Sequence, residues 1–176
     1  MNLQNITLIS FGYLESGVLR IIAGNIRNEF PVNVQIKDGH LDISDYFDAA
    51  RCQFNADKLL QEIENNYSSD NEKTIGLFNV DLFIPIFTYI FGQAYLGGRS
   101  GIVSAFRLNN ERYGLPPDEN LLMERISKEI VHELGHTLGL IHCHIPDCVM
   151  RSGTYVEDID QKSSGLCISC RNKLKL

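Results

Sequence analysis

The chain has 176 residues, 44% of them hydrophobic and 22% charged, with a formal net charge of -6 at pH 7. This length and composition fit a single globular domain that buries its own core, and they exclude an extensively disordered chain. The acidic excess argues against a nucleic-acid-binding surface, which requires clustered lysine and arginine side chains.

The first half of the chain alternates strand and helix patterns. Residues 5–12, NITLISFG, form a β-branched run that predicts a strand, and the spacing over residues 15–30 predicts a helix. The apolar positions of this helix are Val18, Ile21, Ile22 and Ile26. Residues 32–38 alternate apolar and polar side chains as a strand does, and residues 55–66 show one apolar helical face.

Three further strand candidates occupy the middle of the chain. They are residues 74–83, 89–96 and 101–108, and the Gly97-Gly98 pair marks a turn between the last two. With the two earlier strands they make five candidate strands.

A long helix is predicted after the sequence Pro-Pro-Asp at residues 116–118. Asp118 is placed to cap it, because an aspartate side chain accepts hydrogen bonds from the free N–H groups of a first turn. The apolar side of the helix is formed by Leu121, Leu122, Ile126, Ile130 and Val131. The helix leads directly into HELGHTLGLIH, residues 132–142.

This stretch has the spacing of a zinc site with an open coordination position. On a helix, His132 and His136 lie one turn apart on the same face, as two ligands of one ion must. Glu133 projects about 100° further round, where its carboxylate can reach a water beside the ion as a general base. Gly139 permits a left-handed turn that brings His142 round as the third ligand. The alternative is an amphipathic helix with histidines by chance.

Four of the five cysteines follow closely. They are Cys143, Cys148, Cys167 and Cys170, separated by four, eighteen and two other residues. The last two form a Cys-x-x-Cys motif that can bind one ion, and the first two can complete a tetrahedron of thiolates around a second, structural zinc. A redox-active Cys-x-x-Cys or two disulfides are the competing interpretations. We expect the fifth, Cys52, to be buried and unpaired.

The histidine motif with Met150, eight residues after His142, resembles the metzincin metallopeptidases, in which a methionine-bearing turn lies beneath the zinc. Because the motif runs straight into Cys143, then CVM, then CISC, the chain resembles the archaemetzincin family more narrowly. DLFIPIFTYIFGQAYLGGRSGIVSAFRL is similar to that family's sheet segment. The resemblance covers about residues 80–170.

The resemblance implies an α/β fold of compact metzincin-like type. Its features are a mixed, mostly parallel five-stranded sheet with an antiparallel edge strand, flanking helices and a zinc-bound C-terminal segment. The whole chain, 1–176, then forms one metallopeptidase domain, with the sheet and active-site helix in 1–138 and the third ligand and cysteine site in 139–176. Substrate lies along the edge strand, for which 89–96 is the first candidate and 101–108 the second.

The resemblance also assigns roles to single residues and implies two zinc ions per chain. The catalytic zinc ligands are His132, His136 and His142. The structural zinc ligands are Cys143, Cys148, Cys167 and Cys170. Glu133 is the general base and acid, and Met150 is the methionine of the turn. Some metzincins carry a tyrosine two residues after that methionine, where this chain has Ser152, and Tyr155 is out of register.

We therefore expect a zinc metallopeptidase that binds an extended peptide; the sequence favours a monomer but leaves the oligomeric state open. A zinc-stabilised peptide- or protein-binding module without hydrolysis is one alternative, and a zinc hydrolase of a non-peptide amide is another. The intact Glu133 favours hydrolysis over mere binding. The sequence leaves open whether cleavage is internal or at a chain end.

A cytoplasmic location without membrane or nucleic-acid partners is the expectation for this chain. Its longest apolar candidate, VDLFIPIFTYIFG, is shorter than the roughly 20 residues of a membrane-spanning helix and contains Pro85. The first residues lack the basic start of a signal peptide, and Glu15 interrupts their hydrophobicity.

Overall fold

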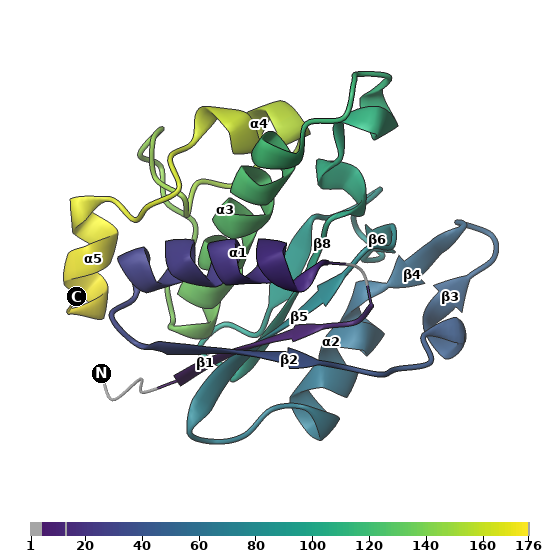
Figure 1. Cartoon of the computed structure of the whole chain (residues 1–176), viewed down its shortest axis with the longest axis horizontal. Coiled ribbons are helices and arrows are strands. Elements are labelled where there is room, and N and C mark those ends of the chain that lie inside the picture. The colour runs from purple at the N-terminus through teal and green to yellow at the C-terminus, as the bar shows by residue number, and fades with distance from the viewer. Residues whose placement is uncertain (1–4, 13, 176) are drawn as a thin grey trace.

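The computed structural model describes residues 5–12 and 14–175. A five-stranded sheet forms its centre, in the order β2-β1-β5-β8-β7 (Figure 1). Its strands are β1 (Asn5–Ser10), β2 (Asn33–Asp38), β5 (Glu72–Phe78), β7 (Gly92–Ala94) and β8 (Ser100–Ser104). The first four strands in that order pair in parallel, and β7 pairs antiparallel with β8 at one edge. The mixed sheet with an antiparallel edge strand is therefore confirmed.

Helices cover both faces of this sheet. On one face α1 (Ser16–Glu29) packs beside α3 (Glu119–Thr137), and on the other face lies α2 (Ala56–Asn66) (Figure 1). The larger hydrophobic core lies on the α1 and α3 side, and a smaller one lies between α2 and the sheet. In α2 the predicted apolar face is buried, whereas in α1 Ile21 is 53% exposed and Leu19 is buried in its place.

The helix α3 begins and ends where the sequence predicts. The Asp118 side chain accepts a hydrogen bond from the Leu121 N–H at 3.0 Å, as an N-cap does. After the helix ends, Gly139 has φ of +90°, in the left-handed region that favours glycine. Its N–H donates to the His136 carbonyl at 2.9 Å, so the chain reverses direction within a few residues.

A second, three-stranded sheet in the order β3-β4-β6 was not predicted. Its strands are β3 (Phe47–Asp48), β4 (Gln53–Asn55) and β6 (Leu82–Phe83). The single strand predicted at 74–83 is wrong, because β5 ends at Phe78 and Ser104 Oγ bonds both the N–H and the carbonyl of Val80. These bonds turn the chain into the second sheet, whose strands are too short to give a sequence pattern.

Of the two candidates for the edge strand, the first, residues 89–96, contains it. Residues 89–96 contain β7, which has β8 as its single sheet neighbour within the described residues. The second candidate, 101–108, is wrong: its first half belongs to β8, which lies inside the sheet between β5 and β7, and its last three residues form the 3-10 helix η2 (Phe106–Leu108).

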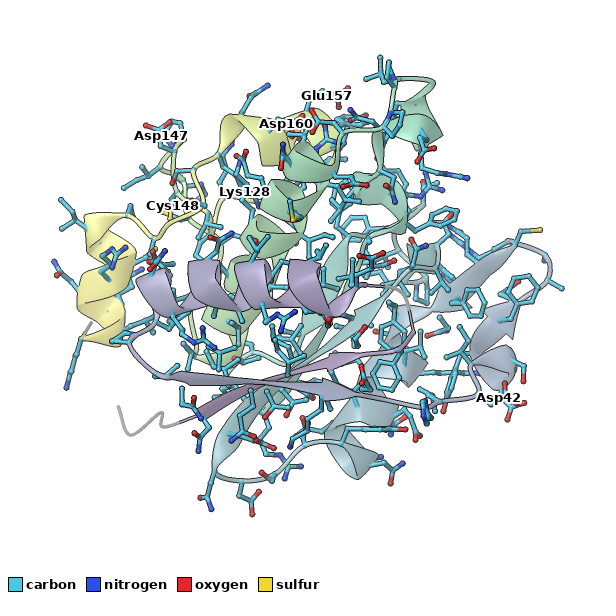
Figure 2. All side chains as sticks on the ribbon, in the orientation of Figure 1. Asp42, Lys128, Asp147, Cys148, Glu157 and Asp160 are labelled. Carbon is cyan, nitrogen blue, oxygen red and sulfur yellow. The ribbon has the colours of Figure 1, made fainter. Side chains whose placement is uncertain are left out.

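The C-terminal part packs against α3. It contains α4 (Val156–Gln161) and α5 (Ile168–Leu174). Two short 3-10 helices, η1 (Ser44–Tyr46) and η3 (Asn110–Tyr113), occur earlier in the chain. Arg125 of α3 forms a bidentate pair with Asp160 of α4, both contacts at 2.7 Å. Beside it, the buried Lys128 ammonium donates to the Ile159 carbonyl at 3.1 Å (Figure 2). These bonds fix the segment that follows α3.

The N-terminal end of the predicted domain, residues 1–4, and its last residue, 176, lie outside the described residues. In the part of the chain that is described, no helix combines the length and apolar character that crossing a bilayer requires.

Candidate metal centres and active site

The three histidines of the motif converge on one point. His132 and His136 project from the last two turns of α3, and the turn at Gly139 brings His142 beside them. Their ring centroids lie 4.7 to 5.3 Å apart, and one nitrogen from each ring lies within 4.8 Å of the other two. The set can therefore hold a single metal ion.

Hydrogen bonds at the far side of two rings decide which nitrogen faces that point. His132 Nδ1 lies 2.8 Å from the Val149 carbonyl oxygen, and His136 Nδ1 lies 2.7 Å from that of Leu140. A carbonyl only accepts, so both Nδ1 atoms carry the proton and both Nε2 atoms carry a lone pair. The two Nε2 atoms face each other at 3.1 Å, a repulsive arrangement that a cation between them makes favourable.

The surroundings also keep the three imidazoles neutral, as metal ligands must be. Burial lowers the pKa of His132 well below its ordinary value, and the positive charge of Lys162 lowers it further. The pKa values of His136 and His142 are lowered too, in both cases chiefly by burial. All three rings are therefore ready to bind a cation at neutral pH.

Glu133 lies beside the histidine cluster without joining it. Its side chain is buried, and its Oε2 has no hydrogen-bond partner among the described residues. Burial raises its pKa well above the ordinary value, and the charge of Glu129 adds to the effect. A buried carboxyl oxygen without a protein partner can accept a hydrogen bond from a group that enters the cavity.

Two glycines make room for this arrangement, and the sequence motifs did not single them out. A Cβ added to Gly92 of β7 would lie 2.8 Å from Glu133 Oε1. The edge strand can therefore lie this close to the glutamate only with glycine at position 92. A Cβ on Gly135 would collide with the sulfur of Met150, which lies beneath the helix. Met150 is fully buried, as the turn methionine of the expectation requires.

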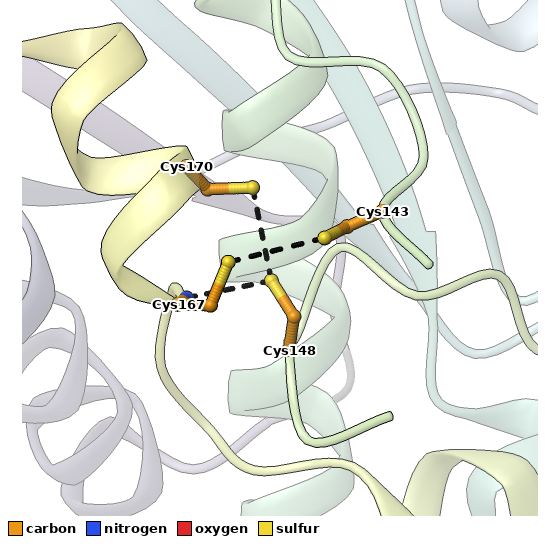
Figure 3. A group of neighbouring side chains, drawn as sticks. All are labelled: Cys143, Cys148, Cys167 and Cys170. Atoms are coloured by element: carbon orange, nitrogen blue, oxygen red, sulfur yellow. Dashed lines mark hydrogen bonds between the residues drawn. The ribbon is translucent and has the colours of Figure 1, made fainter. Parts of the chain in front are cut away.

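The four C-terminal cysteines form a second cluster. No disulfide links them, and their sulfurs point toward one another from the post-helix loop and the start of α5 (Figure 3). Cys143 and Cys167 sulfurs lie 3.9 Å apart, and those of Cys148 and Cys170 lie 3.8 Å apart. Around a zinc ion with Zn–S bonds of about 2.3 Å, tetrahedral sulfurs would be separated by about 3.8 Å. The spacing fits a closed four-thiolate site.

The thiols differ in how readily they ionise. Burial opposes ionisation of Cys167, but the Cys170 N–H and the neighbouring thiols bring its pKa down to about 7. Burial raises the pKa values of Cys148 and Cys170. The fifth cysteine, Cys52, lies apart from the cluster; it is exposed at a positive φ of 54°, so the expectation of a buried residue is wrong.

A cavity of about 670 Å³ opens onto the histidines. The edge strand β7 lines it on one side, and the segment after Met150, Ser152 to Thr154, lines it on the other. Ser152 stands where some metzincins have tyrosine, and Tyr155 is 64% exposed. The tyrosine that does line the cavity is Tyr89, whose hydroxyl donates to the Thr154 carbonyl at 2.9 Å.

A buried ion pair lies in the same cavity wall, and sequence reasoning missed it. Lys162, at the end of α4, is 2% exposed, and its ammonium lies 3.0 Å from Glu129 Oε1 on α3. The ammonium also donates to the Arg151 carbonyl at 3.2 Å. Glu129 lies one helical turn before Glu133, so the pair ties α3 to the segment that follows Met150.

Comparisons with known proteins place these features in a family context. The model of Peptidase family M54 matches residues 11–176. The archaemetzincin of Pyrococcus horikoshii is 40% identical over 161 residues, which cover 89% of this chain and 85% of the relative. That of Sulfolobus acidocaldarius is 35% identical over 176 residues, covering 99% and 98% of the two chains.

Solved structures agree with this similarity. A zinc-dependent peptidase from Methanocorpusculum labreanum superposes with a TM-score of 0.85 at 29% identity, covering 96% of this chain and 99% of its own. The archaemetzincin of Methanopyrus kandleri also gives a TM-score of 0.85, at 30% identity and with coverage of 98% and 93%.

The close approach of Gly135 to Met150 is testable. Gly135→Ala should destabilise the protein by about 1–3 kcal/mol, because the added methyl overpacks the methionine turn. The control is Gly24→Ala in α1, where a Cβ meets nothing within 4 Å and should stabilise the helix by about 0.5–1 kcal/mol. Urea denaturation of both variants measures the two effects. Equal stabilities would contradict the close packing described here.

The buried ion pair gives a second prediction. Lys162→Met should cost about 3–5 kcal/mol, because it leaves the Glu129 carboxylate buried without its counter-charge. Adding Glu129→Gln to that variant should restore part of the loss, since no uncompensated charge remains. Thermal and chemical denaturation of the single and double variants tests the coupling. Strictly additive losses would show that the two side chains do not depend on each other.

Proposed function

The chain belongs to Peptidase family M54 and is a zinc metallopeptidase, and we propose that it hydrolyses peptide bonds at the histidine centre, with Glu133 as the general base. One observation carries the proposal: the His132 and His136 Nε2 lone pairs point at each other, beside a buried Glu133 oxygen with no partner. This is the geometry of a cation site with a proton acceptor next to it. His142 supplies the third ligand.

Zinc at this site supplies Lewis acidity toward the scissile carbonyl and lowers the pKa of water from about 15.7 to near 7. Glu133 accepts the proton of the attacking water and returns it to the leaving amine. The Val149 and Leu140 carbonyls hold the two imidazoles in the required tautomer throughout. Gly92 leaves the Glu133 carboxylate the space it needs.

We assign the second ion, also zinc, to the cysteine cluster. Four thiolates fill every position of a tetrahedral ion, so this site has no place for substrate and contributes to folding instead. Its four ligands join the loop after α3 to α5, which is also held by the buried Leu174 and by the Glu29–Arg171 pair at 2.6 Å. Two zinc ions per chain follow from this assignment.

An extended peptide can pair with the free edge of β7, because that edge lines the cavity. Glu133 defines the leaving-group side of the scissile bond and lies beside Gly92. The His136 carbonyl accepts a hydrogen bond from the Gly97 N–H at 2.8 Å, so the opposite side of the site lies toward Gly97. The C-terminal half of the peptide therefore lies toward the start of β7, and the peptide runs antiparallel to it.

A zinc hydrolase of a non-peptide amide would use the same histidines and glutamate. The exposed edge of β7 favours a peptide substrate, because it can form main-chain hydrogen bonds along an extended peptide that a small amide is too short to form. A mixed peptide library with mass-spectrometric detection separates the two. Cleavage products of peptides support the proposal, and a zinc-loaded protein that leaves every peptide intact contradicts it.

The role of Glu133 can be tested with an isosteric change. Glu133→Gln should lower the rate of peptide cleavage by roughly 10²-fold or more, because an amide cannot take the proton of the attacking water. Zinc content and the thermal midpoint should stay close to wild type. Glu119→Gln, at an exposed position of the same helix, is the matched control and should cleave normally. Undiminished turnover in Glu133→Gln would refute the general-base assignment.

The division into two metal sites gives a further prediction. His142→Ala should reduce the zinc content from two ions per chain toward one and leave the circular dichroism spectrum unchanged, because two histidines hold the ion poorly. Cys167→Ser should instead lower the thermal midpoint, because it weakens an ion that contributes folding energy. Wild-type protein with one zinc ion, or with disulfides in place of free thiols, would contradict the two-site assignment.

A further inference from the structure

Two apolar side chains beside the histidine centre are exposed although they line its cavity. Leu96 is 61% exposed and Ile141 is 62% exposed, and both belong to the cavity wall. Ile141 directly precedes His142. Leu96 precedes Gly97, which is hydrogen-bonded to the His136 carbonyl. The two side chains therefore come from separate segments, each of which adjoins a histidine of the site.

The backbone that carries them is fixed. On either side of Leu96, the N–H groups of Tyr95 and Gly97 donate to backbone carbonyls at 3.1 and 2.8 Å. The N–H of Leu140, the neighbour of Ile141, does so at 2.9 Å, and its carbonyl is held by the His136 ring. A ligand that covers these side chains gains apolar burial without the cost of ordering a loop.

The other end of the cavity differs in chemistry. There the Tyr89 hydroxyl bonds the Thr154 carbonyl across the cavity, and Glu129 and Lys162 lie in the wall. This end is bridged by a hydrogen bond and also carries Phe87, which is 55% exposed and precedes β7. Leu96, in contrast, follows β7, and Ile141 adjoins His142.

We propose that Leu96 and Ile141 form a subsite for a bulky apolar side chain on the residue that contributes the carbonyl of the cleaved bond. The assignment rests on the proposed function, because the leaving-group side is defined by Glu133. A peptide antiparallel to β7 places its N-terminal half over the end of the strand that leads to Leu96. A leucine or similar side chain there covers both apolar groups, whereas glycine covers neither and a charged side chain loses its hydration.

A pair of small zinc-binding probes tests the subsite without requiring cleavage. In N-acetyl-leucine hydroxamate and N-acetyl-glycine hydroxamate the hydroxamate binds zinc, and the side chain occupies the acyl side. Calorimetry on the zinc-loaded protein should show the leucine probe binding about 10-fold or more tightly than the glycine probe, the range expected for an apolar group entering an apolar pocket. The double variant Leu96→Ser with Ile141→Ser should lose most of this ratio.

Two control variants make the result specific. Ile168→Ser removes an isoleucine that is 79% exposed on α5, outside the cavity, and should preserve the ratio. Phe87→Ser removes a 55% exposed cavity residue that precedes β7, at the leaving-group side, and should preserve it as well. Zinc content and thermal midpoint are measured for every variant, so that loss of metal is not mistaken for loss of the subsite.

The outcomes separate this inference from the proposed function. Equal binding of both probes to wild type, or a ratio that survives the double substitution, overturns the subsite while leaving the zinc centre intact. If zinc-loaded protein binds neither probe, the histidine centre itself is misassigned and both proposals fail. In the peptide library, cuts after large apolar residues are expected, and a preference confined to the residue after the cut would contradict the assignment.

Discussion

Two hydrogen bonds determine the chemistry of this protein: those from the His132 and His136 rings to the carbonyls of Val149 and Leu140. They fix the protons on the outer nitrogens and leave the inner lone pairs facing each other. The burial of α3 against the sheet then keeps the rings neutral, so that electrostatic relief comes from a cation and not from protonation. Glycine is required at positions 92 and 135, because β7 lies against Glu133 and α3 lies against Met150.

One loop joins the two proposed metal centres. Cys143 follows His142 directly, and Cys148 precedes Val149, whose carbonyl orients His132. A tetrahedral ion at the cysteines, as proposed, would therefore fix the neighbours of His142 and of Val149, whose carbonyl orients His132. The Cys143 N–H bonds the Met150 carbonyl at 2.9 Å, which closes the segment on itself. In the proposed two-site arrangement, the ion at the cysteines would keep His142 in place as the third ligand of the other ion.

The sequence predicted those features that depend on residues close together in the chain. Asp118 as a cap, Gly139 as a left-handed turn and the two clusters of metal-binding side chains all follow from fixed spacings along one helix or one loop, and the structure brings each set together. The catalytic and ligand roles of these residues remain proposals. Glu129 and Lys162 could not be found this way, because they meet only through the packing of α4 against α3. The same holds for the β3-β4-β6 sheet, whose short strands are specified by partners elsewhere in the chain, and for Ile21, which helical spacing alone placed on the wrong face.

The most direct test of this account is anomalous diffraction at the zinc absorption edge from crystals of the freshly purified protein. The account predicts two zinc peaks per chain. One should lie among the Nε2 atoms of His132 and His136 with His142 as the third ligand, and the other at the centre of the four sulfurs. A map with no peak between the histidines would contradict the central claim, as would cysteines joined in disulfides with no peak among them.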